Sequence, residues 1–468
     1  MHWFYSGSVT KSAGELDSLV NEVLLADNFN VNDLRGFNAK HELNRLDKHT
    51  DTGANNFPAA DGWRQGSVKI PLPKTKVKHT SEDSAPTFEV HGIFYRPLLT
   101  SIKAAYKDAS AMQYHNHTAT SVPSPSSSYA RATTDSDPAH ASSPSERLYS
   151  KAYNTNTLNR LNDAVQKKAR EDREPGDSPS LKYGPARIMM YLDSMHLTNF
   201  GTASLWPIYF WLAALSKYVH AMPTMLAAHH LAYIPSLPDL INQEYKNKYG
   251  FLLTAAVLLF CKKELTQQIW MLLLDNDFLH AYVHGFVVQC GDGIMRCLFL
   301  CILTYSVDYP EKCLIACIKF LGRCPCPDCL VTKDWIHLMG TKRDMATREK
   351  KPREDSSWLR NKLEQVRGWI FKRGLPTEGR AVKAVLGSTS TLLNQSAFSR
   401  RLGQFGFDIY RALVLDVMHK INLGVWKATM MHLVCIVTTI GQSQINNLNS
   451  RYEQQCSAGE DACSLVVF

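Results

Sequence analysis

The sequence has no cysteine before residue 261 and no long hydrophobic segment. Its longest apolar runs, residues 205–215 and 251–261, contain about 11 residues each, fewer than the ~18–20 that cross a bilayer. The first residues lack a basic stretch followed by an apolar core, so no secretory signal is expected. These absences predict a soluble protein without a membrane partner.

Repeats and strong compositional bias are also missing. No heptad, Gly-X-Y period or internal repeat is visible, and 45% of the residues are hydrophobic against 20% charged. This composition supports a packed core and excludes collagen-like, coiled-coil and wholly disordered chains. The length of 468 residues suggests roughly three domains of about 150 residues.

Nine of the twelve cysteines lie between residues 261 and 329, and Cys324, Cys326 and Cys329 form a tight set. A secreted disulfide framework would spread its pairs along the chain, whereas these spacings in a reducing compartment are typical of metal binding. Such thiolates can converge on one tetrahedral Zn²⁺, with His337 as a possible fourth ligand. The alternative is three buried or reactive thiols.

Composition changes along the chain predict five segments. Residues 1–83 are polar and weakly patterned, and we expect a poorly ordered arm. A short structured segment (84–120) is followed by a Ser/Pro-rich linker (121–147) with little to bury. Residues 148–452 form the folded core, and residues 453–468 form a separate tail.

Apolar periodicity predicts the elements of this core. Residues 187–193 form an apolar run that predicts a buried strand, and residues 205–211 predict its antiparallel partner. Two further strands are expected at 287–289 and 297–305. Helices are predicted over residues 262–284, 356–373 and 413–440.

Two acids each close an apolar run. Asp193 ends the first strand, and Asp308 follows a later one. Cleavage of a phosphodiester can use two hard cations ~4 Å apart, and carboxylates are their natural ligands. The alternative is that both acids simply form turns. Asp416 and His419 are a further candidate pair for catalysis. The alternative is that Asp416 caps a helix, because an acid at a helix start is favourable.

Asp277, His280 and His284 are spaced to share one helical face and could bind a metal. The segment lacks the Glu after the first His that a zinc protease needs as its base. Hydrogen-bonded core histidines are therefore the preferred interpretation.

Positive charge is concentrated in residues 342–373, where 11 Lys and Arg stand against 5 Asp and Glu. Such a segment attracts a polyanion through phosphate contacts, although a solvated helix face has the same composition. The candidate nucleic-acid contacts are Lys342, Arg343, Arg348, Lys350, Lys351, Arg353, Arg360, Lys362, Arg367, Lys372 and Arg373.

Several segments, read in order, are similar to a known family. Together they resemble the Plavaka-type transposases of mushroom-forming fungi, relatives of the CACTA (En/Spm-like) cut-and-paste elements. The resemblance covers roughly residues 88–118 and 147–452. It is carried by residues 94–98 (FYRPL), 173–176 (REPG), 191–201 (YLDSMHLTNFG), 226–239 (LAAHHLAYIPSLPD), 308–312 (DYPEK), 321–330 (LGRCPCPDCL), 416–419 (DVMH) and 423–427 (LGVWK).

The resemblance implies an α/β fold: a ribonuclease H-like mixed-sheet core with helical insertions. It implies acids that bind Mg²⁺, cleavage of DNA at transposon ends, and strand transfer from the freed 3′-OH. Asp193 then matches the first acid, and Asp308 matches the second, with Asp292 as the second choice. Asp416 and His419 match the family's Asp-x-x-His signature, and the three cysteines match its cysteine knuckle. DNA is the implied partner, a homo-oligomer is allowed, and a nuclear location is expected, or a cytoplasmic one without import.

The chain also departs from this pattern. The family pattern continues beyond Tyr452 and should supply the third acid there, and the first 83 residues lack a recognisable zinc-finger module. These departures predict a truncated and inactive copy. A non-catalytic remnant that binds zinc and DNA or protein is the alternative. A metallohydrolase that uses the 277–284 helix is a third hypothesis, weakened by its missing base.

Overall fold

The computed structural model describes short pieces between residues 17 and 41 and then residues 61–108, 156–171, 181–196 and 204–457. The chain divides into two compact units. In the smaller unit, Met1–Asn56 with His196–Ala203, the described residues include the helical turns Leu19–Leu24 (η1) and Val31–Leu34 (η2). The larger unit, Phe57–Met195 with Ser204–Phe468, contains all the candidate residues and the sheet except for His196 of its short fourth strand.

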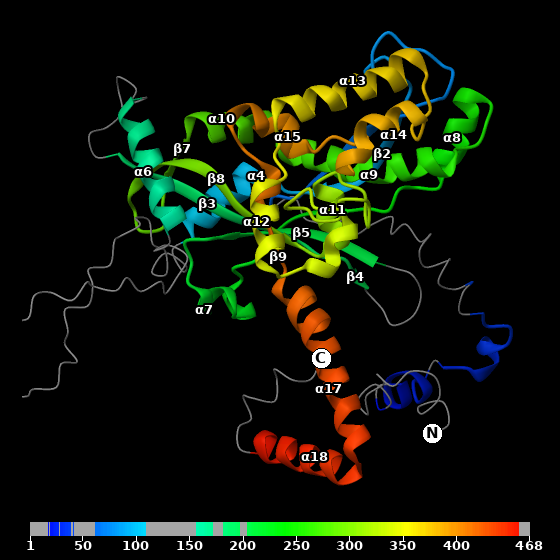
Figure 1. Ribbon diagram of the computed structural model, residues 1–468, viewed down its shortest axis with the longest axis vertical. Coiled ribbons are helices and arrows are strands. Elements are labelled where there is room, and N and C mark those ends of the chain that lie inside the picture. The colour runs from blue at the N-terminus through cyan, green and yellow to red at the C-terminus, as the bar shows by residue number, and fades with distance from the viewer. Residues whose placement is uncertain are drawn as a thin grey trace, which may run out of the picture. The chain divides into compact units, whose positions relative to one another are not determined.

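The described residues form one mixed sheet of nine strands (Figure 1). Its main path runs β1-β2-β6-β5-β3-β8-β7, with β4 added on β5 and β9 added on β8. β8 pairs in parallel with β3 and with β9, whereas β3–β5 and β5–β6 are antiparallel. The strands are β1 (Arg64–Pro71), β2 (Thr87–Tyr95), β3 (Lys182–Leu192), β4 (Met195–His196), β5 (Ser204–Leu212), β6 (His229–Ile234), β7 (Phe286–Gln289), β8 (Met295–Val307) and β9 (Leu413–Leu415).

Helices cover this sheet, and Figure 1 shows α8, α9, α13 and α14 gathered on one side of it. α9 packs on β1 and also contacts α11 and α15. The main helices are α4 (Leu98–Lys107), α6 (Asn156–Glu171), α7 (Lys217–His220), α8 (Leu240–Tyr249), α9 (Ala255–Leu273), α10 (Asn276–His284), α11 (Tyr309–Ile315), α12 (Lys342–Lys350), α13 (Ser357–Arg373), α14 (Arg380–Leu386), α15 (Ala397–Leu402), α16 (Ile409–Ala412), η9 (Met418–Trp426), α17 (Lys427–Ile440) and α18 (Gln442–Ser457). The short turns η5 (Pro223–Met225), η6 (Lys333–Leu338), η7 (Gly387–Thr389) and η8 (Gly403–Phe405) connect them.

β3 lies in the middle of the sheet, and nearly all of its residues are buried or half-buried. Ile188 pairs with Leu212 and Leu192 with Ile208, so β5 is its antiparallel neighbour. A strand with a parallel neighbour and both faces covered reads as a continuous apolar run. The predicted strand pair is therefore confirmed.

The helix predicted at 356–373 is also confirmed. Ser356 caps α13 by accepting a hydrogen bond from Leu359 N, and Gly374 ends it in the left-handed conformation at φ 70°. The helix predicted at 262–284 is instead two helices, α9 and α10. Asp275 caps the second one by accepting a hydrogen bond from Phe278 N at 2.7 Å, because a short carboxylate satisfies the first free N–H groups of a helix.

The expected arm 1–83 needs correction at its end. β1 belongs to the sheet and pairs with β2, and Val68, Ile70 and Leu72 are buried. Gly66 and Pro71 interrupt the alternating pattern, which hid this strand in the sequence. The linker 121–147 and residues 458–468 lie outside the described residues.

The segment predicted as one helix over 413–440 begins as strand β9. The helix that follows, Met418–Ile440, has a hydropathy of 1.5, and none of it is buried in the protein. By length and composition alone it could cross a membrane. The sequence shows no long apolar run here because polar residues such as Asn422 and Lys427 interrupt the segment.

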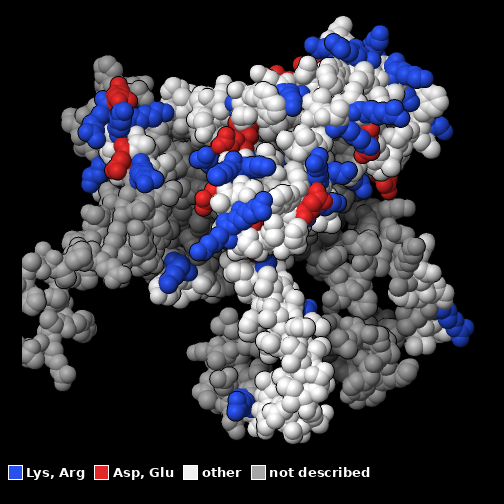
Figure 2. All heavy atoms as spheres, viewed as in Figure 1, with Lys and Arg blue, Asp and Glu red and all other residues white. Residues whose placement is uncertain are grey.

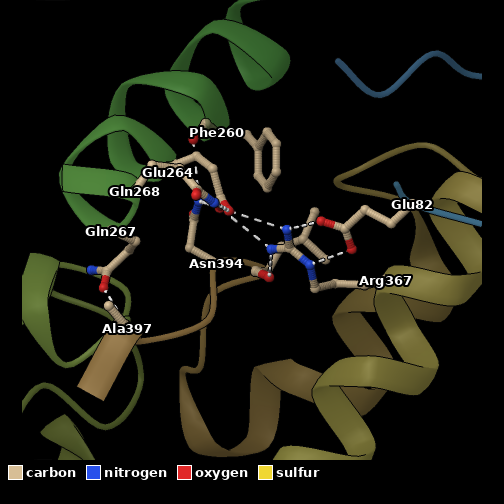
Figure 3. Close-up of polar contacts among 9 residues, drawn as sticks. Glu82, Phe260, Glu264, Gln267, Gln268, Arg367, Asn394 and Ala397 are labelled. Carbon is tan, nitrogen blue, oxygen red and sulfur yellow. Dashed lines mark hydrogen bonds and ion pairs between the residues drawn. The ribbon is translucent and has the colours of Figure 1, made fainter. Parts of the chain in front are cut away.

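A buried ionic cluster joins three parts of the larger unit (Figure 3). Arg367 of α13 is 5% exposed and donates hydrogen bonds to Glu82, in the β1–β2 connection, and to Glu264 of α9. Asn394 donates to the same Glu264 carboxylate at 2.8 Å. Burial raises the pKa of Glu264, but the charge and hydrogen bonds of Arg367 outweigh it, and the net shift is downward. The cluster therefore ties α9, α13 and the β1–β2 connection together.

We predict that Arg367→Met destabilises the fold by roughly 3–5 kcal/mol, because it leaves Glu264 buried without its cation. The matched change Arg373→Met, on the exposed end of the same helix, should change stability by less than ~0.5 kcal/mol. Urea unfolding at pH 7 measures both. The pKa of Glu264 in the folded protein lies below 4.5. The stabilisation that the Glu264–Arg367 pair gives the fold is therefore present above that pH and is lost in stronger acid. Equal effects of the two substitutions would contradict the role of the cluster.

Candidate active site

Three parallel strands end at the same edge of the sheet. Tyr191 of β3 pairs with Ser306 of β8, and Ser306 pairs with Val414 of β9. These residues therefore form one rung across three neighbouring strands. The residues that follow parallel strands lie at a common edge of the sheet. In open α/β sheets, ligands bind at this edge.

An acid lies two residues beyond each member of this rung: Asp193, Asp308 and Asp416. Residues two apart project from the same face of an extended chain, and adjacent strands lie ~4.8 Å apart. The shared register therefore brings the three carboxylates together in what we call the acidic row. The row depends on two strand pairings, each between segments more than 100 residues apart.

The row is electrostatically coupled. Burial raises the pKa of Asp193, and the charges of Asp308 and Asp416 raise it further, against the opposing effects of His419 and of the Tyr191 hydrogen bond. The Tyr191 hydroxyl donates to Asp193 Oδ2 at 3.3 Å. Three acids whose charges repel one another favour a bound cation.

His419 and Asp416 form a close pair. His419 Nδ1 lies 2.5 Å from Asp416 Oδ2, and Met418 N donates to Asp416 Oδ1 at 3.0 Å. Asp416 follows β9 directly, so it ends a strand and also fixes the first turn of the helix. The hydrogen bond between Asp416 and His419 raises the pKa of His419, whereas partial burial lowers it. The pair presents a positively charged or proton-donating ring next to the row.

Two residues of α11 complete the site and were missed from the sequence. Glu311 is buried, and burial together with Asp308 and Asp193 raises its pKa to about 8. Lys312 is 1% exposed, and burial lowers its pKa to about 8. Asp308 caps this helix by accepting a hydrogen bond from Glu311 N at 2.9 Å. The i, i+3 spacing of Asp308 and Glu311 was the signal that could have located Glu311.

The other proposed acid lies elsewhere. Asp292 is in the turn before β8, at the opposite end of this 13-residue strand from Asp308. Its two carboxylate oxygens accept hydrogen bonds from Arg296 at 2.7 Å. Asp292 is therefore not part of the acidic row.

The ring centroids of His280 and His284 on α10 lie 4.7 Å apart. Both residues are exposed, so the prediction that they are core histidines is wrong. Among the described residues, no group of three or more His, Cys, Asp or Glu side chains is arranged to hold one metal ion. This applies to Asp277 with these histidines, to the acidic row and to the cysteines. Metal binding at any of them is an expectation from donor chemistry.

The cysteine loop is built around Arg353. Its guanidinium donates to the carbonyl oxygens of Cys324 and Cys326 at 2.7 and 2.8 Å, and to that of Thr389. The thiol of Cys329 lowers the pKa of Cys326 by hydrogen bonding, so these two side chains are in contact. Cys324 Sγ faces backbone carbonyls instead. His337 lies on η6 and is exposed.

The basic segment divides into internal and surface residues. Arg353 and Arg367 are buried and bonded within the protein, which corrects their assignment as DNA contacts. Arg348 and Arg360 bind Asp344 and Asp355 at 2.8 and 3.2 Å. Figure 2 shows Lys and Arg gathered over the helices around α13 and α14. The candidates that remain at the surface are Lys342, Arg343, Lys350, Lys351, Lys372 and Arg373, with Lys362 partly exposed over Trp358.

Comparison with known proteins gives one family. Residues 185–434 match the family model of the Plavaka transposase, which is more than half of the 468 residues. The matched range contains the acidic row, His419 and the cysteine loop. No curated protein matches the chain.

We predict that Asp416→Asn lowers the pKa of His419, because it removes the carboxylate that stabilises the imidazolium. Asp308→Asn should lower it less, since Asp308 acts on His419 only through its charge. Histidine-selective NMR titration of both variants measures the two shifts. A larger shift in Asp308→Asn would mean that the pair with Asp416 does not determine the ionisation of His419.

Proposed function

Because the chain belongs to the Plavaka transposase family, we propose that it is a DNA transposase whose acidic row catalyses Mg²⁺-dependent strand cleavage and strand transfer at transposon ends. The observation that supports this proposal is the shared register of Asp193, Asp308 and Asp416 at the ends of three parallel strands.

The strand order supports a ribonuclease H-like core. β6, β5 and β3 form an antiparallel meander, and β8 and β9 follow on the other side of β3 in parallel. A ribonuclease H-like sheet has this arrangement of three antiparallel strands followed by two parallel ones. β1, β2 and β7 then extend the sheet at its two edges.

The chemistry follows from the donors in the row. Bound Mg²⁺ ions, when present, activate the attacking oxygen and stabilise the leaving oxygen of an in-line displacement. Asp193, Asp308 and Asp416 would hold these ions through carboxylate oxygens, the ligands that Mg²⁺ prefers. Tyr191 orients Asp193 by its hydrogen bond. His419, fixed by Asp416, holds a proton at the edge of the row, where an imidazolium stabilises a phosphate oxygen.

The position of Asp416 argues against the expectation of an inactive copy. That expectation assumed that the third acid lies beyond Tyr452, whereas Asp416 supplies a third carboxylate to the row. We therefore favour an active site over a non-catalytic remnant. The remnant, which would bind DNA through the surface cations without cutting it, is the alternative that the first experiment below tests.

We predict that the purified protein nicks DNA carrying the element's ends in Mg²⁺ or Mn²⁺ and that Asp193→Ala reduces the rate at least a hundredfold, because in-line displacement needs its metal ligands. Asp292→Asn is the matched control, since that acid lies at the far end of β8, and it should retain activity within about threefold. Gel assays on supercoiled and end-labelled DNA measure the rates. No metal-dependent nicking by folded protein would instead support the non-catalytic remnant.

We also propose that the cysteine loop binds zinc, supported by the contact between the thiols of Cys326 and Cys329. Reduced protein should then carry about one equivalent of zinc, because a structural site takes one tetrahedral ion. Cys326→Ser/Cys329→Ser should lose it, whereas the exposed Cys435 can be changed to Ser without effect. Elemental analysis measures the content. Zinc-free wild-type protein prepared without chelators would identify the three cysteines as ordinary thiols.

A further inference from the structure

A large cavity lies on the helical side of the larger unit, and its lining includes no residue of the acidic row and none of the three clustered cysteines. Its volume is about 710 Å³, within the range of small-molecule and nucleotide pockets. It is lined by α9, by α14 and by the loop that follows α11. Neither the proposed reaction nor the zinc site accounts for it.

The cavity has an apolar floor and an aromatic rim. Phe260, Val382 and Leu386 are buried in its wall, whereas Phe320 is 47% exposed and Leu321 63% exposed. Figure 3 shows Phe260 and Asn394, which also line the cavity, beside the ionic cluster of Arg367. A rigid floor with exposed aromatic surface above it suits a flat, partly apolar group.

Positive charge surrounds this floor. The lining contains Lys263, Lys319, Arg323, Lys333 and Lys383, but Glu378 as its sole acid. Glu378 pairs with Lys383 at 3.7 Å. For the other four cations, no ion pair occurs within the described part of the chain. This excess of cations is complementary to an anion such as a phosphate.

The loops around the cavity hold a constrained backbone. Leu321 and Ser390 adopt left-handed conformations at φ 48° and 55°, which non-glycine residues rarely keep unless the surroundings impose them. Ser390 Oγ accepts a hydrogen bond from Cys324 N at 2.9 Å. A Cβ on Gly322 would lie 2.8 Å from Ser390 Oγ. The cysteine loop therefore holds the rim of the cavity in a fixed shape.

The cavity is connected to the acidic row by α11. Asp308 begins this helix, and the residues after its end enter the cavity lining. Tyr309 and Phe320 are in ring contact, with centroids 5.3 Å apart. Tyr309 directly follows Asp308, so Phe320 on the cavity rim lies beside the start of the helix that the acidic row caps.

We propose that this cavity binds one unpaired nucleotide of the DNA strand that is held at the acidic row. The base lies on Phe320 and the apolar floor, and its phosphates contact Lys319, Arg323 and the neighbouring lysines. An unpaired base is required because a paired one offers no free face for stacking. This inference rests on the proposed function for its choice of DNA as the ligand.

Fluorescence anisotropy in buffer without Mg²⁺, Mn²⁺ or chelator tests the proposal without cleavage, so a failure of nicking leaves this result interpretable. The probes are a labelled single strand, a blunt duplex of the same sequence, and unlabelled dAMP as competitor. Phe320→Ala and Lys319→Gln/Arg323→Gln should each weaken single-strand binding about tenfold, since stacking and phosphate contacts are lost. Duplex binding should change less than about twofold.

Lys372→Gln/Arg373→Gln, two cations at the end of α13, is the matched control and should weaken the duplex more than the single strand. Thermal melting establishes that each variant is folded. Unchanged single-strand affinity in both cavity variants would overturn the proposal. Displacement of the strand by dAMP at equal nucleotide concentration would also overturn it, because the site would then serve a free nucleotide.

Discussion

Parallel pairing of β8, with β3 on one side and β9 on the other, is the constraint on which the candidate chemistry depends. The backbone hydrogen bonds between Tyr191, Ser306 and Val414 fix a register in which each strand is followed, two residues later, by an acid. A slip of one residue in either pairing would turn one carboxylate to the opposite face. The acids repel one another, so the energy that keeps them together comes from the sheet and not from the site.

The helical layer differs from the sheet in that it holds buried charges in defined positions. Arg367 joins two glutamates, and Arg353 uses its donors on backbone carbonyls of the cysteine loop. In each case a planar guanidinium supplies hydrogen bonds from separate nitrogens in a fixed fork, whereas a lysine has its donors on a single nitrogen. The two arginines were indistinguishable in the sequence from the surface cations beside them.

Local features were predictable from the residues themselves, whereas the grouping of Asp193 with Asp308 came only from the family resemblance. Ser356 and Gly374 mark the ends of α13 because capping depends on neighbouring residues, and the strand ending near Asp193 follows from its apolar run. The position of Asp416 in one row with Asp193 depends on two pairings, of β3 with β8 and of β8 with β9, each across more than 100 residues. Without that pairing Asp416 resembles a helix cap, and the site lacks its third carboxylate. Glu311 was overlooked because burial, and not its local sequence, makes it unusual.

The exposed helix Met418–Ile440 has a practical consequence for work with this protein in solution. Apolar area left in water promotes self-association, and salts such as sulfate strengthen that tendency. Contacts between surface lysines or arginines and phosphate weaken as salt rises. Raising the ionic strength therefore increases self-association of the protein and decreases its affinity for nucleic acid. A buffer that keeps the protein attached to DNA will also be the one in which the free protein stays dispersed.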